Sequence, residues 1–173
     1  MRLQLLSDLH LETETFDPQP APGAELLVLG GDIDANWTAL ERFAGWPQPM
    51  LMVSGNHEFD GRDLVHDWPL LRERCSRFGI RLIERESVVL TSAAGQRVRF
   101  VGTVRWSDFD LFGEAQRERA MRASAYFLKL MSARCDGVDL TPERLREESL
   151  ACRDWLAAEL RRRLEAKRQL LLA

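Results

Sequence analysis

Three short apolar runs early in the chain are each followed by residue types that bind metal ions in proteins. In chain order, the runs and the polar residues after them are Leu3–Leu6 with Asp8 and His10, Leu26–Leu29 with Asp32, and Met50–Val53 with Asn56 and His57. Carboxylate, imidazole and amide groups without thiolates suit divalent ions such as Mn²⁺, Fe²⁺ or Zn²⁺. The residue types therefore point to a site for a divalent metal ion.

The apolar runs are predicted to be neighbouring strands of one parallel sheet. None of them alternates apolar with polar residues, which is typical of strands buried on both faces. The segments between them are long enough for crossover connections rather than tight hairpins. Because ligands bind beyond the carboxyl ends of the strands in open α/β sheets, we expect five side chains to converge at one edge. They are Asp8, His10, Asp32, Asn56 and His57.

The three motifs differ in how specific they are. An Asp-x-His pair arises by chance in many chains, and a Gly-Asp pair after a strand is usually a turn. The run Gly55-Asn56-His57-Glu58 specifies four residues in a row. Such a run should occur by chance in roughly one chain in a thousand. The order of all three motifs, each at the end of a predicted strand, favours a functional site.

Taken together, the motifs resemble the signature of the calcineurin-like metallophosphoesterase family, which runs D-x-H, then G-D, then G-N-H-[DE]. Here these are Asp8-Leu9-His10, Gly31-Asp32 and Gly55-Asn56-His57-Glu58, and Gly102–Phe109 is similar to a segment of small bacterial members. The resemblance implies an α/β fold, a sandwich of two mixed sheets flanked by helices. It implies a single domain over residues 1–173 that is incomplete at its C-terminal end.

The resemblance also implies a role for each residue. Asp8 and His10 would bind the first of two metal ions, Asp32 would bridge both ions, and Asn56 would bind the second. His57 would be the catalytic residue beside the phosphate, where it stabilises charge or protonates the leaving oxygen. The implied cofactors are Mn, Fe or Zn ions, and the implied partner is a phosphorylated substrate of unspecified kind.

The sequence departs from the family pattern in its histidines. The pattern continues to a further His and a G-H-x-H motif, which complete the metal sites, but this chain has three histidines in all. The third, His66, falls in a predicted helix, where a surface position is the simpler interpretation. We therefore expect the N-terminal portion of a phosphoesterase that binds two ions weakly, one ion or none. The alternative is a non-catalytic remnant or interaction module that keeps the first half of the fold.

Composition and sequence patterns indicate the cellular compartment of the protein and exclude some classes of partner. The 173 residues include 24 basic and 27 acidic ones, for a formal net charge of −3, which argues against a strongly basic nucleic-acid surface. Three cysteines without a C-x-x-C motif favour a reducing compartment. No apolar run is long enough for a membrane span, and the N-terminus lacks the apolar region of a signal peptide. These features predict a cytoplasmic protein without membrane contact.

The remaining patterns predict the supporting elements. Helices are expected over residues 35–44, 61–78 and 116–131, and in a segment beginning at Thr141; strands are expected at Ile80–Ile83, Ser87–Thr91 and Arg97–Gly102. Trp106, just past the last of these strands, has core packing as its simpler interpretation and substrate contact as the other. The apolar end Gln169–Ala173 is expected to begin a further strand, whose uncovered edge would promote self-association and marginal stability.

Overall fold

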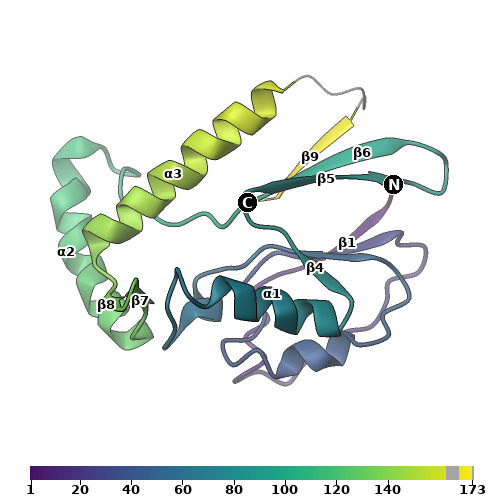
Figure 1. Ribbon diagram of the computed structural model, residues 1–173, viewed down its shortest axis with the longest axis horizontal. Coiled ribbons are helices and arrows are strands. Elements are labelled where there is room, and N and C mark those ends of the chain that lie inside the picture. The colour runs from purple at the N-terminus through teal and green to yellow at the C-terminus, as the bar shows by residue number, and fades with distance from the viewer. Residues whose placement is uncertain (163–167, 173) are drawn as a thin grey trace.

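The computed structural model describes residues 1–162 and the backbone of 168–172, and it contains two main sheets (Figure 1). The first has the order β1-β2-β3-β4 and is parallel throughout, with bounds Leu3–Leu6, Leu26–Leu29, Met50–Met52 and Ile80–Leu82. The second has the order β5-β6-β9, with bounds Glu86–Thr91, Arg97–Gly102 and Arg168–Leu172. In it, β5 pairs antiparallel with β6, and β6 pairs parallel with β9.

Three α-helices, two short 3₁₀ helices (η1, Ala39–Phe43, and η2, His57–Phe59) and a small hairpin complete the described elements. The α-helices are α1 (Trp68–Arg77), α2 (Glu114–Met131) and α3 (Pro142–Arg161), and the hairpin strands are β7 (Arg134–Cys135) and β8 (Val138–Asp139). Figure 1 shows α1 beside the first sheet and α3 running from the β7–β8 hairpin towards the second sheet. No helix among residues 1–162 is both long enough and apolar enough to cross a membrane.

The first sheet separates two apolar cores. Alternate side chains of β2 point to opposite faces, as strand geometry requires. Leu26 and Val28 pack in the cluster that contains Phe100 of the second sheet. Leu27 and Leu29 pack on the other side, in the larger cluster that extends to the helices. The predicted α/β sandwich flanked by helices is therefore the observed architecture, with one parallel and one mixed sheet.

The prediction that all three early strands are buried on both faces is wrong for β1. Leu3 is 38% exposed and Leu5 is 64% exposed, whereas every residue of β2 is buried. The strand lies at the edge of the sheet, and its Leu3 and Leu5 are in register with Leu26 and Val28. The second sheet covers this face of the first sheet at β2. It does not extend over Leu3 and Leu5 of β1.

Two predicted helices are shorter than expected because aspartates bind the backbone locally. Over residues 35–44 only a 3₁₀ turn forms, at Ala39–Phe43. The Asp34 carboxylate accepts hydrogen bonds from the backbone of Asn36 and Ala39, which is an alternative to helical pairing. Over 61–78 the helix begins at Trp68, since the Asp63 carboxylate accepts the backbone N–H groups of Val65 and His66.

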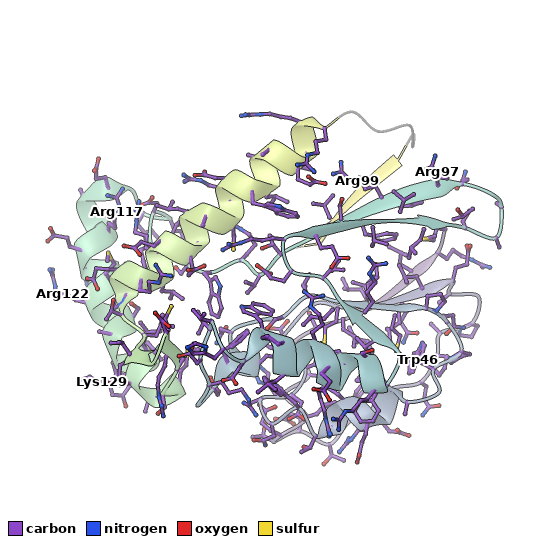
Figure 2. All side chains as sticks on the ribbon, viewed as in Figure 1. Trp46, Arg97, Arg99, Arg117, Arg122 and Lys129 are labelled. Atoms are coloured by element: carbon purple, nitrogen blue, oxygen red, sulfur yellow. The ribbon has the colours of Figure 1, made fainter. Side chains whose placement is uncertain are left out.

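The later elements follow the predictions closely. The β5–β6 hairpin closes with a hydrogen bond from the Ser92 backbone to the Gln96 carbonyl, and Thr141 caps α3 by accepting the Arg144 N–H at 3.2 Å. The spacing of the sequence also predicts an apolar stripe along α3, formed by Leu145, Cys152, Leu156, Leu160 and Leu164. This stripe is wrong at one position, because Leu160 is exposed and its neighbour Glu159 is buried. Glu159 forms an ion pair with the buried Arg99 of β6, which lies near the C-terminal end of α3 (Figure 2). The stripe's last residue, Leu164, lies outside the described residues.

Candidate metal centre

The loops after β1, β2 and β3 lie side by side at the carboxyl edge of the first sheet. Main-chain pairing continues past the strands, with the Asp8 N–H donating to the Gly31 carbonyl at 3.0 Å and the His10 N–H donating to the Asp32 carbonyl at 3.1 Å. The His57 N–H donates to Oδ1 of Asp32 at 2.9 Å. These bonds hold the three sequence motifs together, as the parallel arrangement predicts.

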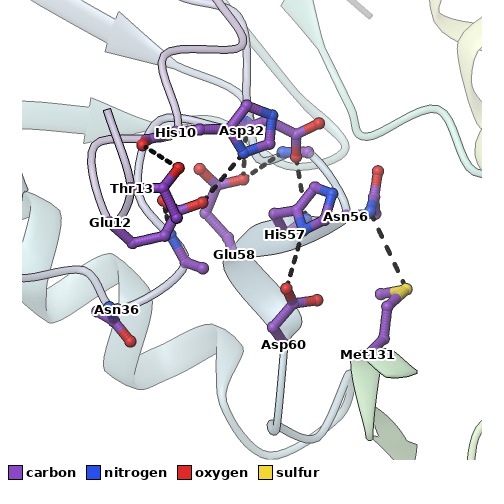
Figure 3. Close-up of polar contacts among 12 residues, drawn as sticks. His10, Glu12, Thr13, Asp32, Asn36, Asn56, His57, Glu58, Asp60 and Met131 are labelled. Carbon is purple, nitrogen blue, oxygen red and sulfur yellow. Dashed lines mark hydrogen bonds and ion pairs between the residues drawn. The ribbon is translucent and has the colours of Figure 1, made fainter. Parts of the chain in front are cut away.

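Three of the five predicted side chains form one cluster (Figure 3). His10, Asp32 and His57 each present a ligand-type atom, and these atoms lie within 4.8 Å of one another. The two imidazole rings meet edge to face, with their centroids 4.9 Å apart. All three side chains are partly exposed, so the cluster is open to solvent. Two imidazoles and a carboxylate are a fitting donor set for a divalent transition metal.

The other two predicted residues lie beside this cluster rather than in it. Asp8 is joined to the Gly31 turn through its backbone, and its side chain is exposed. Asn56 directs its amide towards the sulfur of Met131, at 4.0 Å, and lines a cleft with Asp32. His66 is not part of this cluster, and its exposed imidazole faces the exposed Asp136 carboxylate at 3.3 Å. The surface interpretation of His66 is confirmed.

Three residues other than glycine have left-handed backbone geometry at this edge. The φ angles are 52° at Asp8, 44° at His10 and 52° at Asp32. These values lie in the left-handed region, which side chains other than glycine rarely occupy. Such residues cost on the order of 1–3 kcal/mol each and occur where the surrounding structure enforces them, often at functional sites. The left-handed turns allow two residues of one short loop, Asp8 and His10, to lie next to the adjacent loop.

Glycine is required at position 55 because the Asp32 carboxylate leaves no room there for a Cβ atom. A methyl group on Gly55 would lie 2.7 Å from both the Cγ atom and the backbone nitrogen of Asp32. Gly31 is equally confined, because a methyl group there would lie 2.5 Å from the Gly55 nitrogen. Its φ of 92° also disfavours other residues. The two glycines of the motifs therefore let the second and third loops approach each other closely.

Glu58 is a supporting residue whose role the sequence motif did not reveal. Its buried carboxylate accepts the backbone N–H groups of Asp32 at 3.0 Å, Ile33 at 2.7 Å and Gly55 at 2.7 Å. Burial raises the pKa of Glu58, although the hydrogen bonds from Ile33 and Gly55 oppose this. A side chain with two acceptor oxygens satisfies three donors of the turns, so Glu58 fixes the loops that carry Asp32 and Asn56.

Two further carboxylates orient the imidazoles. Glu12 contacts Nδ1 of His10 at 3.0 Å, and Asp60 contacts Nδ1 of His57 at 2.8 Å. Burial lowers the pKa of His57, but the hydrogen bond and charge of Asp60 outweigh it and leave that pKa raised. Carboxylates on Nδ1 leave Nε2 available, an arrangement common for histidines that bind metals or move protons. The short spacings from His10 to Glu12 and from His57 to Asp60 are the only sequence signals of this support.

A cleft of about 390 Å³ opens beside Asp32 and Asn56. One wall comes from the turns after β2 and β3, and the other comes from the segment after β6 with Leu145 of α3. The volume is within the range of small-molecule sites. Trp106 lines this cleft and is also 6% exposed with its ring 6.1 Å from Phe59, so it has the packing role that was the simpler interpretation.

Comparison with known proteins identifies a structural similarity that spans nearly the whole chain. No family model matches the sequence, and no curated protein matches it. Among solved structures, the chain is similar to the crystal structure of phosphopantetheinyl hydrolase (PptH) from Mycobacterium tuberculosis, with a TM-score of 0.68 and 18% sequence identity. The similarity covers 99% of this chain and 67% of that chain. The chain therefore has an α/β fold of the kind found in that hydrolase.

Proposed function

We propose that this protein is a divalent-metal-dependent phosphoesterase of the calcineurin-like metallophosphoesterase family. The observation that carries the proposal is the convergence of His10, Asp32 and His57 at the carboxyl ends of three parallel strands. The similarity to a phosphopantetheinyl hydrolase supports a hydrolase fold, and the ordered motifs support the family. The site carries more weight than the fold, because one fold can host many activities.

The metal ligands in this proposal follow the motifs. His10 and Asp32 would hold the first ion together with Asp8, whose backbone adjoins the Gly31 turn. Asp32 and Asn56, which line the same cleft, would hold the second ion. Bound divalent ions would activate water and offset the charge of the phosphoryl oxygens. Mn²⁺, Fe²⁺ and Zn²⁺ all suit this donor set.

His57 acts on the substrate side of the reaction. Hydrolysis adds water to the phosphorus and releases an alcohol, so the leaving oxygen must gain a proton. His57 is held by Asp60 through Nδ1, which leaves Nε2 free to donate that proton or to stabilise phosphoryl charge. Its position within the His10–Asp32 cluster is compatible with either role.

Metal-dependent turnover tests the proposal. The full chain is freed of metal with a chelator, and hydrolysis of p-nitrophenyl phosphate and bis(p-nitrophenyl) phosphate is measured with and without added Mn²⁺. We expect hydrolysis only with metal, and a loss of at least about 100-fold in Asp32→Asn, because a transition-state electrostatic contact is worth that much. His66→Gln is the matched control, since His66 lies on the surface.

Two results would contradict the proposal in different ways. Equal activity in wild type and Asp32→Asn would place the chemistry elsewhere. Mn²⁺ binding in calorimetry without turnover of either ester would favour the alternative, a non-catalytic module that keeps the fold and the metal cluster. A phosphopantetheine ester belongs in the substrate panel because of the structural neighbour, with no preference for it expected at 18% identity.

A further inference from the structure

The cleft beside Asp32 contains one cationic side chain, Arg105, that is not paired with an acidic group within the described residues. Arg105 lines the cleft together with Asp32 and Asn56, and it is exposed. Within residues 1–162, its guanidinium forms no hydrogen bond or ion pair, whereas nearby Arg146 is paired with Asp110 at 3.0 Å. The other residues that line the cleft are neutral apart from the acidic Asp32. Arg105 therefore supplies the positive charge of this cleft.

The segment that carries Arg105 is held in place by its backbone. Glu84, just after β4, accepts the Val104 N–H at 2.8 Å, and the buried Ser149 of α3 donates to the Trp106 carbonyl at 2.6 Å. Arg146 donates to the Asp108 carbonyl at 3.1 Å. Neighbouring turns of α3 and the end of the first sheet thus fix the main chain around Arg105, while its side chain stays free. Because the main chain is already fixed, only the Arg105 side chain has to be ordered when it binds an anion.

The charge and size of the cleft indicate which anion it would take. A phosphate monoester carries close to two negative charges at neutral pH, whereas a diester carries one. Attraction to a fixed cation increases with the charge of the ligand. Guanidinium also matches phosphate geometry and can donate two parallel hydrogen bonds to it. A volume of about 390 Å³ suits a small phosphorylated molecule rather than a polymer surface.

We propose that Arg105 is a specificity-determining residue that binds a non-bridging oxygen of the substrate phosphate and selects phosphate monoesters over diesters. This inference rests on the phosphoesterase function proposed above and names its substrate class. The site is shared between the two sheets, with metal ligands from the first and the phosphate-binding cation from the segment after the second.

Arg105→Gln and Arg105→Lys test this role in the Mn²⁺-loaded full chain. The values of kcat/KM are measured for p-nitrophenyl phosphate and bis(p-nitrophenyl) phosphate, and the binding of orthophosphate is measured by calorimetry. We expect Arg105→Gln to lower kcat/KM for the monoester by about 10- to 100-fold, in line with charged hydrogen bonds, and to change the diester less than about threefold. Arg105→Lys should recover part of the loss, because it restores charge without the guanidinium geometry.

The control is Arg119→Gln on α2. Arg119 is also without a partner among the residues with described side chains, but it lines a different cavity. It should leave both esters and orthophosphate binding unchanged. Equal losses for monoester and diester in Arg105→Gln, or no loss, would overturn the proposal. If the wild type hydrolyses neither ester, the phosphoesterase function fails, whereas unchanged orthophosphate binding in Arg105→Gln refutes the Arg105 site separately.

Discussion

The two sheets differ in how they position the residues that they contribute to the cleft. The first sheet ends in loops with left-handed residues at Asp8, His10 and Asp32, which the neighbouring turns hold in place. The second sheet continues into residues 103–106, which have no positive φ and whose backbone is hydrogen bonded to Glu84 and Ser149. Changes at the first edge should therefore reduce turnover of every substrate, whereas changes at the second should alter the choice between substrates.

The largest expected effect comes from Gly55→Ala at the first edge. The added methyl group would displace the Asp32 carboxylate. A displacement of about 1 Å at a reacting group can cost about 100-fold in rate. Steady-state kinetics should show equal losses of kcat/KM for the two p-nitrophenyl esters.

Gly45→Ala is the control for this comparison. Gly45 has open space around its Cα, and its φ is 74°. The variant therefore bears only the backbone strain of a left-handed residue that is not glycine. Wild-type kinetics in Gly55→Ala would show that the approach of the two loops is unimportant for the chemistry.

Glu58→Gln should have the next largest effect, on both stability and turnover. Glutamine offers one acceptor oxygen where the carboxylate offers two, so at least one buried N–H of Asp32, Ile33 or Gly55 loses its partner. A buried unpaired donor costs about 2 kcal/mol. Denaturant unfolding measures this loss, with the exposed Glu73→Gln as control. A free energy of unfolding equal to that of the control would contradict the role given to Glu58.

The third variant, Ser149→Ala, is aimed at the second edge. It removes the hydrogen bond to the Trp106 carbonyl. This loss should lower the free energy of unfolding by about 1 kcal/mol. Because the Arg105 segment loses one of its attachments, the ratio of monoester to diester kcat/KM should fall by a few fold. A uniform fall for both esters would mean that the two edges do not have separate roles.

The smallest effect is the pH dependence that Glu84 contributes to stability. Burial raises the pKa of Glu84 above its ordinary value of 4.5, although the hydrogen bonds from Val104 and Thr103 oppose the shift. An acid whose folded-state pKa is raised contributes stability below its unfolded-state pKa, and this contribution is lost as the pH rises through the folded-state pKa. Wild type should therefore lose stability relative to Glu84→Gln as the pH increases above that ordinary value. A constant difference between the two proteins would refute this assignment.

The residues at the carboxyl edge of the first sheet could be predicted because they directly follow the apolar strands in the sequence. Uninterrupted apolar runs identified β2 and β3, and the polar residues directly after each strand identified the cluster of His10, Asp32 and His57. The roles assigned to the five residues remain predictions. The supporting residues Glu12 and Asp60 were missed because a carboxylate two or three residues from a histidine is common in any chain.

Features that depend on distant partners could not be predicted from local patterns. The exposure of Leu5 depends on how far the second sheet extends over the first, and the burial of Glu159 depends on Arg99, which is 60 residues away. Trp37 has a φ of 64°, which interrupts the helix expected over residues 35–44. The predicted strand at the C-terminal end forms, as β9, while self-association through it stays a prediction.

The proposed function requires the cluster of His10, Asp32 and His57 to hold a catalytic metal ion. Crystals of the full chain grown with Mn²⁺, measured at a wavelength where manganese scatters anomalously, locate the ion directly. We predict an anomalous peak bonded to the Asp32 carboxylate and His10, which is absent in Asp32→Asn crystals grown in the same way. Ordered Asp32 and His10 side chains with no peak between them at millimolar Mn²⁺, or a peak at other residues, would contradict the claim.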